Sequence, residues 1–467
     1  MVDPRLDRLV EQLRGGGIDR RTFLVRASAL GMSAFAAGAA LRSAGVAAQD
    51  ASPSPMASPS PGASPAVGGE LTPETLGQAG IQHNADTSGG TVKLISSWPM
   101  TGASEQIGND SVAAVELALE VYGGAAGGFA VDYEFLDDGI AANNGAWDAT
   151  REAENATRAV NDADCMVYLA TYNSGAAEAA IPITNEAGLA MISPANTALR
   201  LTKEHPTNPE GYPDVLYPSG TRNYMRPVPA DDIQGSASAN WAYNTKEAQS
   251  VFILHDNQTY GLGVAQIFND TYLELGGEVL GFEPFDPQAP DYQALMTRIA
   301  ALGPAMIYLG AIVNLNASKL LQDMRAVMPA GEVTFMGPDG LINQSFVDAA
   351  GDAAEGAYIT FAGLPADALD GTGAVWFETM QERLGHVPDA YAAYSFEIAV
   401  VSIQAIDQVG AKDRAQILDA MFNTSEFRGL IGTWSFTETG DTDATTMSLN
   451  IVKDGAITFQ EDIAPSQ

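Results

Sequence analysis

Short apolar runs alternate with amphipathic stretches along the middle of the chain. Runs rich in β-branched and aromatic residues fall at 250–255, 305–310 and 332–336. A polar loop that carries glycine follows each run, and a helical pattern begins again after the loop. This alternation predicts a parallel α/β sheet, in which ligands gather at the carboxyl ends of the strands. Tyr260 and Asp339 both fall at such ends.

A second series with the same alternation precedes this one. Its expected strands cover 91–96, 130–136, 165–170 and 188–193, with helices at 107–122, at 146–161 and from about Gly175. Beyond residue 340 the pattern predicts a strand at 357–361, helices at 373–384, 391–409 and 413–422, and a C-terminal β hairpin. Two similar lobes joined by several crossings of the chain would produce this order.

Composition adds a strong charge imbalance. The chain has 467 residues, with 23 basic and 58 acidic side chains and a formal net charge of −35. A surface this acidic repels nucleic acid and anionic lipid headgroups, so we expect no nucleic-acid partner. The one cysteine, Cys165, lies inside an apolar run, which excludes an intrachain disulfide and is typical of a small buried side chain.

Residues 1–48 have the features of a targeting segment. Arg20-Arg21-Thr22-Phe23-Leu24 precedes a weakly apolar stretch, and Val46-Ala47-Ala48 forms a small-residue cleavage pattern. The segment resembles a twin-arginine export signal, with Asp19 where Ser or Thr is more usual. The apolar stretch of about 15 residues is too short for a comfortable membrane span. We therefore expect an exported, extracytoplasmic protein.

A spacer is expected between this segment and the folded part. Residues 50–69 repeat Ser-Pro and end in Val-Gly-Gly, a low-complexity composition that cannot form a core. The prediction is a disordered Pro/Ser-rich spacer at 49–89 and a folded part that begins near Gly90.

Nucleotide binding is the first alternative function. Gly261-x-Gly263-x-x-Gln266 follows a strand and opens a helix, as in dinucleotide-binding proteins, and Glu283 lies further on. The third glycine is missing, however, and the loop after His255 is too long for the tight turn. The pattern therefore disfavours a nucleotide site.

Catalytic and metal-binding patterns are also missing. The four histidines lack ligand spacing, no Gly-x-Ser-x-Gly occurs, and Asp441-x-Asp443 lacks the remaining ligands of a calcium loop. His255 is expected to be a packed or hydrogen-bonded residue. We expect neither an enzyme nor a cofactor or metal site.

Several segments, taken in order, resemble the extracytoplasmic solute-binding proteins of ABC importers, of the leucine/isoleucine/valine-binding type. The segments are Met191-Ile-Ser-Pro194, Tyr224-Met-Arg-Pro…Asp232-Ile-Gln-Gly235, His255-Asp…Tyr260-Gly-Leu-Gly263, Asp291-Tyr292, Phe335-Met-Gly-Pro-Asp-Gly340, Gly351-Asp-Ala-Ala-Glu-Gly356 and Phe427-Arg-Gly-Leu-Ile-Gly432…Gly440-Asp441 with Asp454-Gly455. The match covers about residues 90–460.

The resemblance implies an α/β fold of two doubly wound, Rossmann-like lobes joined by a hinge of three crossings, with the ligand cleft between the lobes. One lobe would hold 90–228 and 364–430, and the other 229–363 and 431–467. The implied partners are one small solute, an amino acid, and the membrane subunits of an ABC importer. A monomer is expected.

The resemblance also implies the residues of the site. The ligand carboxylate would lie at a helix N-terminus after Asn173, Ser174 and Gly175, where backbone N–H groups favour an anion. A second set of contacts would come from Ser193, Ala195, Asn196 and Thr197. Across the cleft, Tyr260 would stack on the ligand and Asp339 would hold its ammonium group.

Two departures from the family pattern leave the ligand open. Gln106-Ile107 and Ile312-Val313 stand where the family often has aromatic residues, which changes the shape of the pocket. The solute is expected to be a branched-chain or other α-amino acid, and the alternatives are an amide, a urea-like solute or a carboxylate. A ligand-sensing receptor module is the alternative role. Transport is favoured because no transmembrane or signalling domain follows residue 467.

Overall fold

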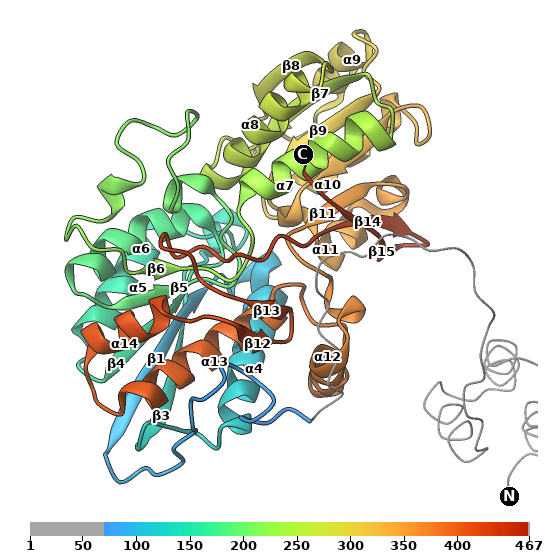
Figure 1. Cartoon of the computed structure of the whole chain (residues 1–467). Coiled ribbons are helices and arrows are strands. Elements are labelled where there is room, and N and C mark those ends of the chain that lie inside the picture. Colours follow the sequence, from blue (N-terminus) through green and yellow to red (C-terminus); the bar gives the residue numbers. More distant parts are fainter. Residues whose placement is uncertain (1–69, 466–467) are drawn as a thin grey trace, which may run out of the picture. The chain divides into compact units, whose positions relative to one another are not determined.

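The computed structural model describes residues 70–465 (Figure 1). The predicted export segment and residues 49–69 of the predicted spacer lie outside the described residues. No helix within 70–465 is long and apolar enough to cross a membrane.

The first sheet has six strands in the order β2-β3-β1-β4-β5-β6. Its strands are β1 (Thr91–Trp98), β2 (Ala125–Ala126), β3 (Phe129–Asp137), β4 (Cys165–Ala170), β5 (Ala190–Ile192) and β6 (Tyr224–Met225). All neighbours pair in parallel except the short edge strand β2. Successive residues of the central strands enter two different cores, because Leu94 and Leu169 pack on one face and Ile95 and Tyr168 on the other. Burial on both faces explains why β4 is apolar throughout.

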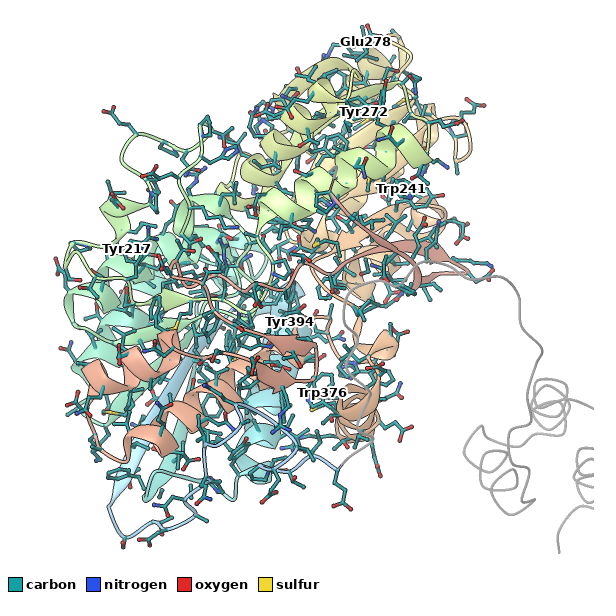
Figure 2. All side chains as sticks on the ribbon, in the orientation of Figure 1. Tyr217, Trp241, Tyr272, Glu278, Trp376 and Tyr394 are labelled. Atoms are coloured by element: carbon teal, nitrogen blue, oxygen red, sulfur yellow. The ribbon has the colours of Figure 1, made fainter. Side chains whose placement is uncertain are left out.

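Helices cover both faces of this sheet. They are α4 (Glu105–Val121), α5 (Ala149–Asn161), α6 (Ser174–Glu186), α12 (Gly371–Leu384), α13 (Ala392–Val409) and α14 (Arg414–Phe422). Residues of α4, α12, α13 and α14 share the core with Leu94, and residues of α5 and α6 share the core with Ile95. Trp376 of α12 and Tyr394 of α13 are both fully or almost fully buried (Figure 2).

The second sheet has seven strands in the order β15-β14-β11-β10-β9-β7-β8. They are β7 (Ser250–His255), β8 (Glu278–Pro284), β9 (Met306–Gly310), β10 (Thr334–Gly337), β11 (Tyr358–Phe361), β14 (Met447–Lys453) and β15 (Ala456–Ile463). The first five are parallel, and the last two form an antiparallel edge. Its helices are α7 (Asp231–Asn240), α8 (Thr259–Glu274), α9 (Gln293–Ala300), α10 (Ala317–Val327) and α11 (Gln344–Ala350). The two parallel sheets confirm the predicted two-lobed α/β fold.

The chain crosses between the lobes three times: after β6, after β11 and before β14. A buried ion pair ties the first crossing to the third, because Arg226 Nε lies 2.7 Å from Asp441 Oδ1. The same guanidinium donates to the backbone oxygens of Asn196 and Ala198 and to the hydroxyl of Thr202. Each of the three guanidinium nitrogens of this buried cation therefore donates to an oxygen of the hinge region.

Two predicted boundaries differ from the structure. Residues 70–89 are not a disordered spacer: Leu76 is 2% exposed in the first-lobe core, and the Gly77 N–H donates to Arg428 O at 2.7 Å. The third crossing also lies between Trp434 and the start of β14 instead of after 430. The hairpin of β12 (Phe427–Gly429) and β13 (Gly432–Trp434) packs on the first lobe through the buried Trp434. In both places an apolar side chain packs into a core whose other residues are distant in the sequence.

Candidate functional site

The N-terminus of α6 forms one wall of the candidate site. The buried strand β4 ends at Ala170, and α6 begins at Ser174 after a loop of three residues. The first turn of a helix leaves backbone N–H groups without intrahelical acceptors, so this wall favours an anion. Asn173 and Ser174 line a small cavity here, as predicted from the sequence.

Gly175, also expected at the carboxylate end of the ligand, packs closely against a neighbouring ring. A Cβ atom at this position would lie 2.3 Å from Cζ2 of Trp147. The glycine therefore leaves room for the indole ring to pack against the first turn of α6. Gly175 does not line the cavity.

The turn after β5 stabilises the loop that leads into this wall. Ser193 Oγ donates to Thr171 O at 2.7 Å and accepts from the N–H groups of Ala195 and Asn196. Asn196 Nδ2 donates to Tyr172 O at 2.9 Å. These bonds fix the loop that leads into α6. The side chains of Ser193 and Asn196 are thus engaged with the protein, and of the four predicted residues in this turn only Ala195 lines the cavity.

Tyr260 and Asp339 form the opposite wall. Tyr260 is in the first turn of α8, after β7, and Asp339 follows β10. The Tyr260 hydroxyl donates to Oδ1 of Asp339 at 2.5 Å and accepts from the Gly340 N–H at 2.8 Å. A Cβ atom at Gly340 would lie 2.7 Å from the Tyr260 ring and 2.6 Å from Ala311 O, so only glycine fits there. The sequence analysis placed both residues after strand ends, and in the structure both lie at the carboxyl edge of the sheet.

Tyr391 completes the site and was missed by the sequence analysis. It precedes α13 in the first lobe, and its hydroxyl donates to Oδ2 of Asp339 in the second lobe. Its ring meets Tyr172 edge to face, with centroids 5.5 Å apart. The residue lies 52 positions from Asp339 at an ordinary helix start, so local sequence carried no signal for this contact.

The site is strongly acidic. Burial raises the pKa of Asp339, and the hydrogen bonds from Tyr260 and Tyr391 oppose that rise. Asp231, in the first turn of α7, is 1% exposed, and neither of its carboxylate oxygens has a hydrogen-bond partner among the described residues. Burial raises the pKa of Asp231 well above its ordinary value, and the nearby Asp339 adds to the effect. Of the two, Asp339 lines the cavity, and a buried carboxylate there favours a cation beside it.

Thr197 lies beside this acidic pair. Its backbone oxygen accepts from the Asp231 N–H at 2.9 Å, and its buried hydroxyl has no partner among the described residues. Thr197 does not line the cavity itself.

Two small cavities occupy the space between these walls. The head cavity, of about 20 Å³, is lined by Asn173, Ser174, Ala195, Tyr260 and Asp339, together with Tyr172, Ile312, Gly340 and Tyr391. Five of the nine predicted site residues therefore meet in one place. The inner cavity, also of about 20 Å³, adjoins it through Tyr172, Asn173 and Ile312 and adds the apolar side chains of Ile107 and Ile342. Each volume suits about one water molecule, so a larger ligand requires the walls to move apart.

The remaining candidate residues are structural. His255 is 4% exposed, and its Nδ1 accepts from the Asn257 N–H at 3.1 Å, in keeping with the packed residue expected from the sequence. Within residues 70–465 no group of three or more His, Cys, Asp or Glu side chains is arranged to hold a metal ion.

Known proteins share this fold and sequence pattern. Residues 91–456 match the family model described as periplasmic binding protein. The leucine-, isoleucine-, valine-, threonine-, and alanine-binding protein of Pseudomonas aeruginosa is 25% identical over 354 residues, which cover 75% of this chain and 87% of that protein.

Two crystal structures extend the comparison. A leucine-binding protein from Thermotoga maritima has a TM-score of 0.70 and 25% identity, and the match covers 80% of this chain and 99% of that one. A solute-binding protein from R. palustris in complex with benzoate has a TM-score of 0.67 and 20% identity, with 80% and 97% covered, which shows the shared fold. The chain belongs to the periplasmic binding protein family, and is an extracytoplasmic solute-binding protein of the ABC-importer type and not an enzyme.

Proposed function

We propose that the chain binds a free α-amino acid with an aliphatic, branched side chain and delivers it to an ABC importer. The observation that carries this proposal is the pairing of two opposite walls in one cavity. The N-terminus of α6, with Ser174, faces the Asp339 carboxylate. The first suits a ligand carboxylate and the second a ligand ammonium group, so the two walls match the two ends of a zwitterion.

The inner cavity supports an aliphatic side chain. Ile107, Ile312 and Ile342 line it and are almost completely buried. Burial of one aliphatic side chain against such a surface contributes roughly 1.5–3 kcal/mol. The names of the relatives from Pseudomonas aeruginosa and Thermotoga maritima, which state that those proteins bind leucine, point in the same direction.

A carboxylate without an ammonium group is the second candidate, because the R. palustris protein of the same fold holds benzoate. The negative charge of this site disfavours a ligand that carries only a carboxylate. Asp339 is buried at the cavity, and a ligand that brings only negative charge would leave this carboxylate without a counter-charge. A zwitterion is therefore the better match.

Export and delivery complete the proposal. The twin-arginine-like segment at Arg20-Arg21 would take the protein across the membrane, and a monomer would then dock on the importer's membrane subunits. Capture of those subunits by the tagged protein would distinguish transport from a ligand-sensing role.

A thermal-shift panel tests the ligand class. The panel contains branched-chain and other α-amino acids, their amides, urea and benzoate. Because a ligand that binds only the folded state stabilises it by RT ln(1 + [L]/Kd), about 2.7 kcal/mol at 100-fold excess over Kd, leucine or a close relative should raise the melting temperature by several degrees. A panel in which benzoate raises the melting temperature and every α-amino acid leaves it unchanged would overturn the proposal.

A further inference from the structure

A large cavity lies next to the site and not within it. This outer chamber measures about 750 Å³. Its first-lobe wall is the loop 142–149, and its second-lobe wall is formed chiefly by 312–318 with Gln258 and Gln288. A chamber of this size is in the range of cavities that hold small ligands.

The three cavities form a series. The head cavity shares Ile312 with the inner cavity, and the inner cavity shares Ile312, Val313 and Asn314 with the outer chamber. A solute whose charged head lies at Asp339 would therefore direct its side chain past Ile312 towards the outer chamber.

Asn314 stands at the boundary between the inner cavity and the outer chamber. Its Nδ2 donates to Ser104 Oγ at 2.8 Å and to Asn144 O at 3.3 Å, both in the first lobe. These bonds connect the two lobes at the point where a side chain would pass. Asn314 is 9% exposed, so the side chain at the boundary is almost completely buried.

The outer chamber is lined by apolar and polar residues in similar measure and is almost uncharged. The side-chain amides of Asn143, Asn144, Gln258 and Gln288 line it and make no hydrogen bond to any of the described residues. Its one ionisable side chain, Asp148, already accepts from the N–H groups of Thr150 and Arg151 as the cap of α5. In a chain with a net charge of −35, a chamber lined by free amides favours an uncharged group that both donates and accepts hydrogen bonds.

Trp147 links the chamber to the head of the site. The half-buried indole ring lines the chamber and also packs on Gly175 in the first turn of α6. An occupant of the chamber would thus contact the residue that supports the carboxylate-binding wall.

We propose that the outer chamber binds the distal end of an elongated α-amino acid whose side chain ends in an uncharged carboxamide or ureido group, with Asn314 as the gate. The inference rests on the proposed function, because the head of the same solute occupies the cavity at Asp339. It extends the proposed substrate class from compact aliphatic amino acids to longer ones with a neutral polar end.

Calorimetry with leucine, citrulline and arginine tests the proposal. Citrulline and arginine are nearly equal in shape and differ in charge, whereas leucine fills only the inner cavity. Citrulline should bind at least about tenfold more tightly than either of the others, since two or more amide hydrogen bonds account for a difference of that size.

Tryptophan fluorescence reports on the chamber directly. Trp147 is half-buried, whereas Trp98, Trp241, Trp376 and Trp434 are at most 5% exposed. Citrulline should shield the fluorescence of the wild-type protein from acrylamide and leucine should not, and Trp147→Phe should abolish the difference.

The double variant Asn143→Ala/Gln288→Ala, at two exposed positions, should lose citrulline affinity about tenfold and keep its leucine affinity.

The outcomes separate the two proposals. Leucine binding that is tighter than citrulline binding, with no shielding of Trp147 by any ligand, overturns the elongated-ligand proposal and leaves the proposed function intact. Binding of none of the three amino acids overturns the proposed function and this inference with it.

Discussion

The hydroxyl of Tyr391 in the first lobe donates a hydrogen bond to Oδ2 of Asp339 in the second lobe. The other carboxylate oxygen accepts from Tyr260, which belongs to the same lobe as Asp339. One buried carboxylate thus joins both walls of the site. The residue that we expect to hold the ligand's ammonium group is also a contact between the lobes.

Replacement of Tyr391 or of Tyr260 distinguishes the hydrogen bond between the lobes from the hydrogen bond within one lobe. Tyr391→Phe removes a bond between the lobes, and a hydrogen bond to a charged group contributes about 1.5–3 kcal/mol. We expect this variant to have a larger radius of gyration than the wild type in small-angle scattering without ligand. Tyr260→Phe removes a bond to the same carboxylate within one lobe and should leave the radius unchanged. Equal radii for both variants would contradict this account of lobe closure.

The buried hinge ion pair should matter for stability. Asp441→Asn leaves the Arg226 guanidinium, which is 0% exposed, without its counter-charge. We expect a loss of about 3–5 kcal/mol in the free energy of unfolding, measured by urea denaturation. Asp164→Asn is the control, since its pair with Lys412 is half exposed and should contribute less than about 1 kcal/mol. Similar losses in the two variants would show that burial of the hinge pair has no special effect.

The sequence predicted the strands that are buried on both faces. The expected runs at 165–170 and 250–255 coincide with β4 (Cys165–Ala170) and β7 (Ser250–His255). Such strands consist almost entirely of apolar residues, which is a strong local signal. The strand β8 (Glu278–Pro284) was not predicted, because it is only partly buried at the sheet edge and contains Gly281.

The cavity residues that the sequence indicated lie in the segments that follow strand ends. Ser174, Tyr260 and Asp339 occupy such positions, so the parallel topology brings them together. Tyr391 and Trp147 reach the same region through packing between distant segments, for which local sequence has no signal. Ser193 and Asn196 were assigned to the ligand, but the geometry of their own turn engages both side chains.

Buried carboxyl groups should make the protein most stable at mildly acidic pH. Burial raises the pKa of Asp138 to about 8, and that of Asp256, Asp389 and Glu397 to about 7. A carboxyl group whose pKa is higher in the folded state stabilises the protein below its unfolded pKa, and this contribution is lost as the pH rises through the folded value. The free energy of unfolding should therefore fall between about pH 5 and about pH 8.

The variant Asp138→Asn tests this pH dependence. Both carboxylate oxygens of Asp138 lack partners among the described residues, so the amide removes a buried charge without breaking an ion pair. The decrease in the free energy of unfolding over that pH range should be smaller than in the wild type. Asp367→Asn, at an exposed position, should follow the wild-type curve. An unchanged slope for Asp138→Asn would contradict the assignment.

The export proposal has a simple genetic test. Because the twin-arginine route depends on its arginine pair, replacement of Arg20 and Arg21 by lysine should leave the protein in the cytoplasm. Fractionation and immunoblotting measure the distribution. Normal export of this variant would mean that residues 1–48 act through another route.

The most direct test of the amino-acid site is the affinity of Asp339→Asn for the cognate amino acid, measured by calorimetry. The asparagine keeps the shape and one acceptor but removes the charge that we expect to face the ligand's ammonium group. Loss of one partner from a buried pair costs about 3–5 kcal/mol, which corresponds to roughly two to four decades in Kd. The melting temperature of the ligand-free variant should change little, because the lost hydrogen bond to the carboxylate and the removal of a carboxyl group whose pKa is raised by burial act in opposite directions. A Kd within about threefold of the wild-type value would contradict the account, since the ligand would then carry no ammonium group at Asp339.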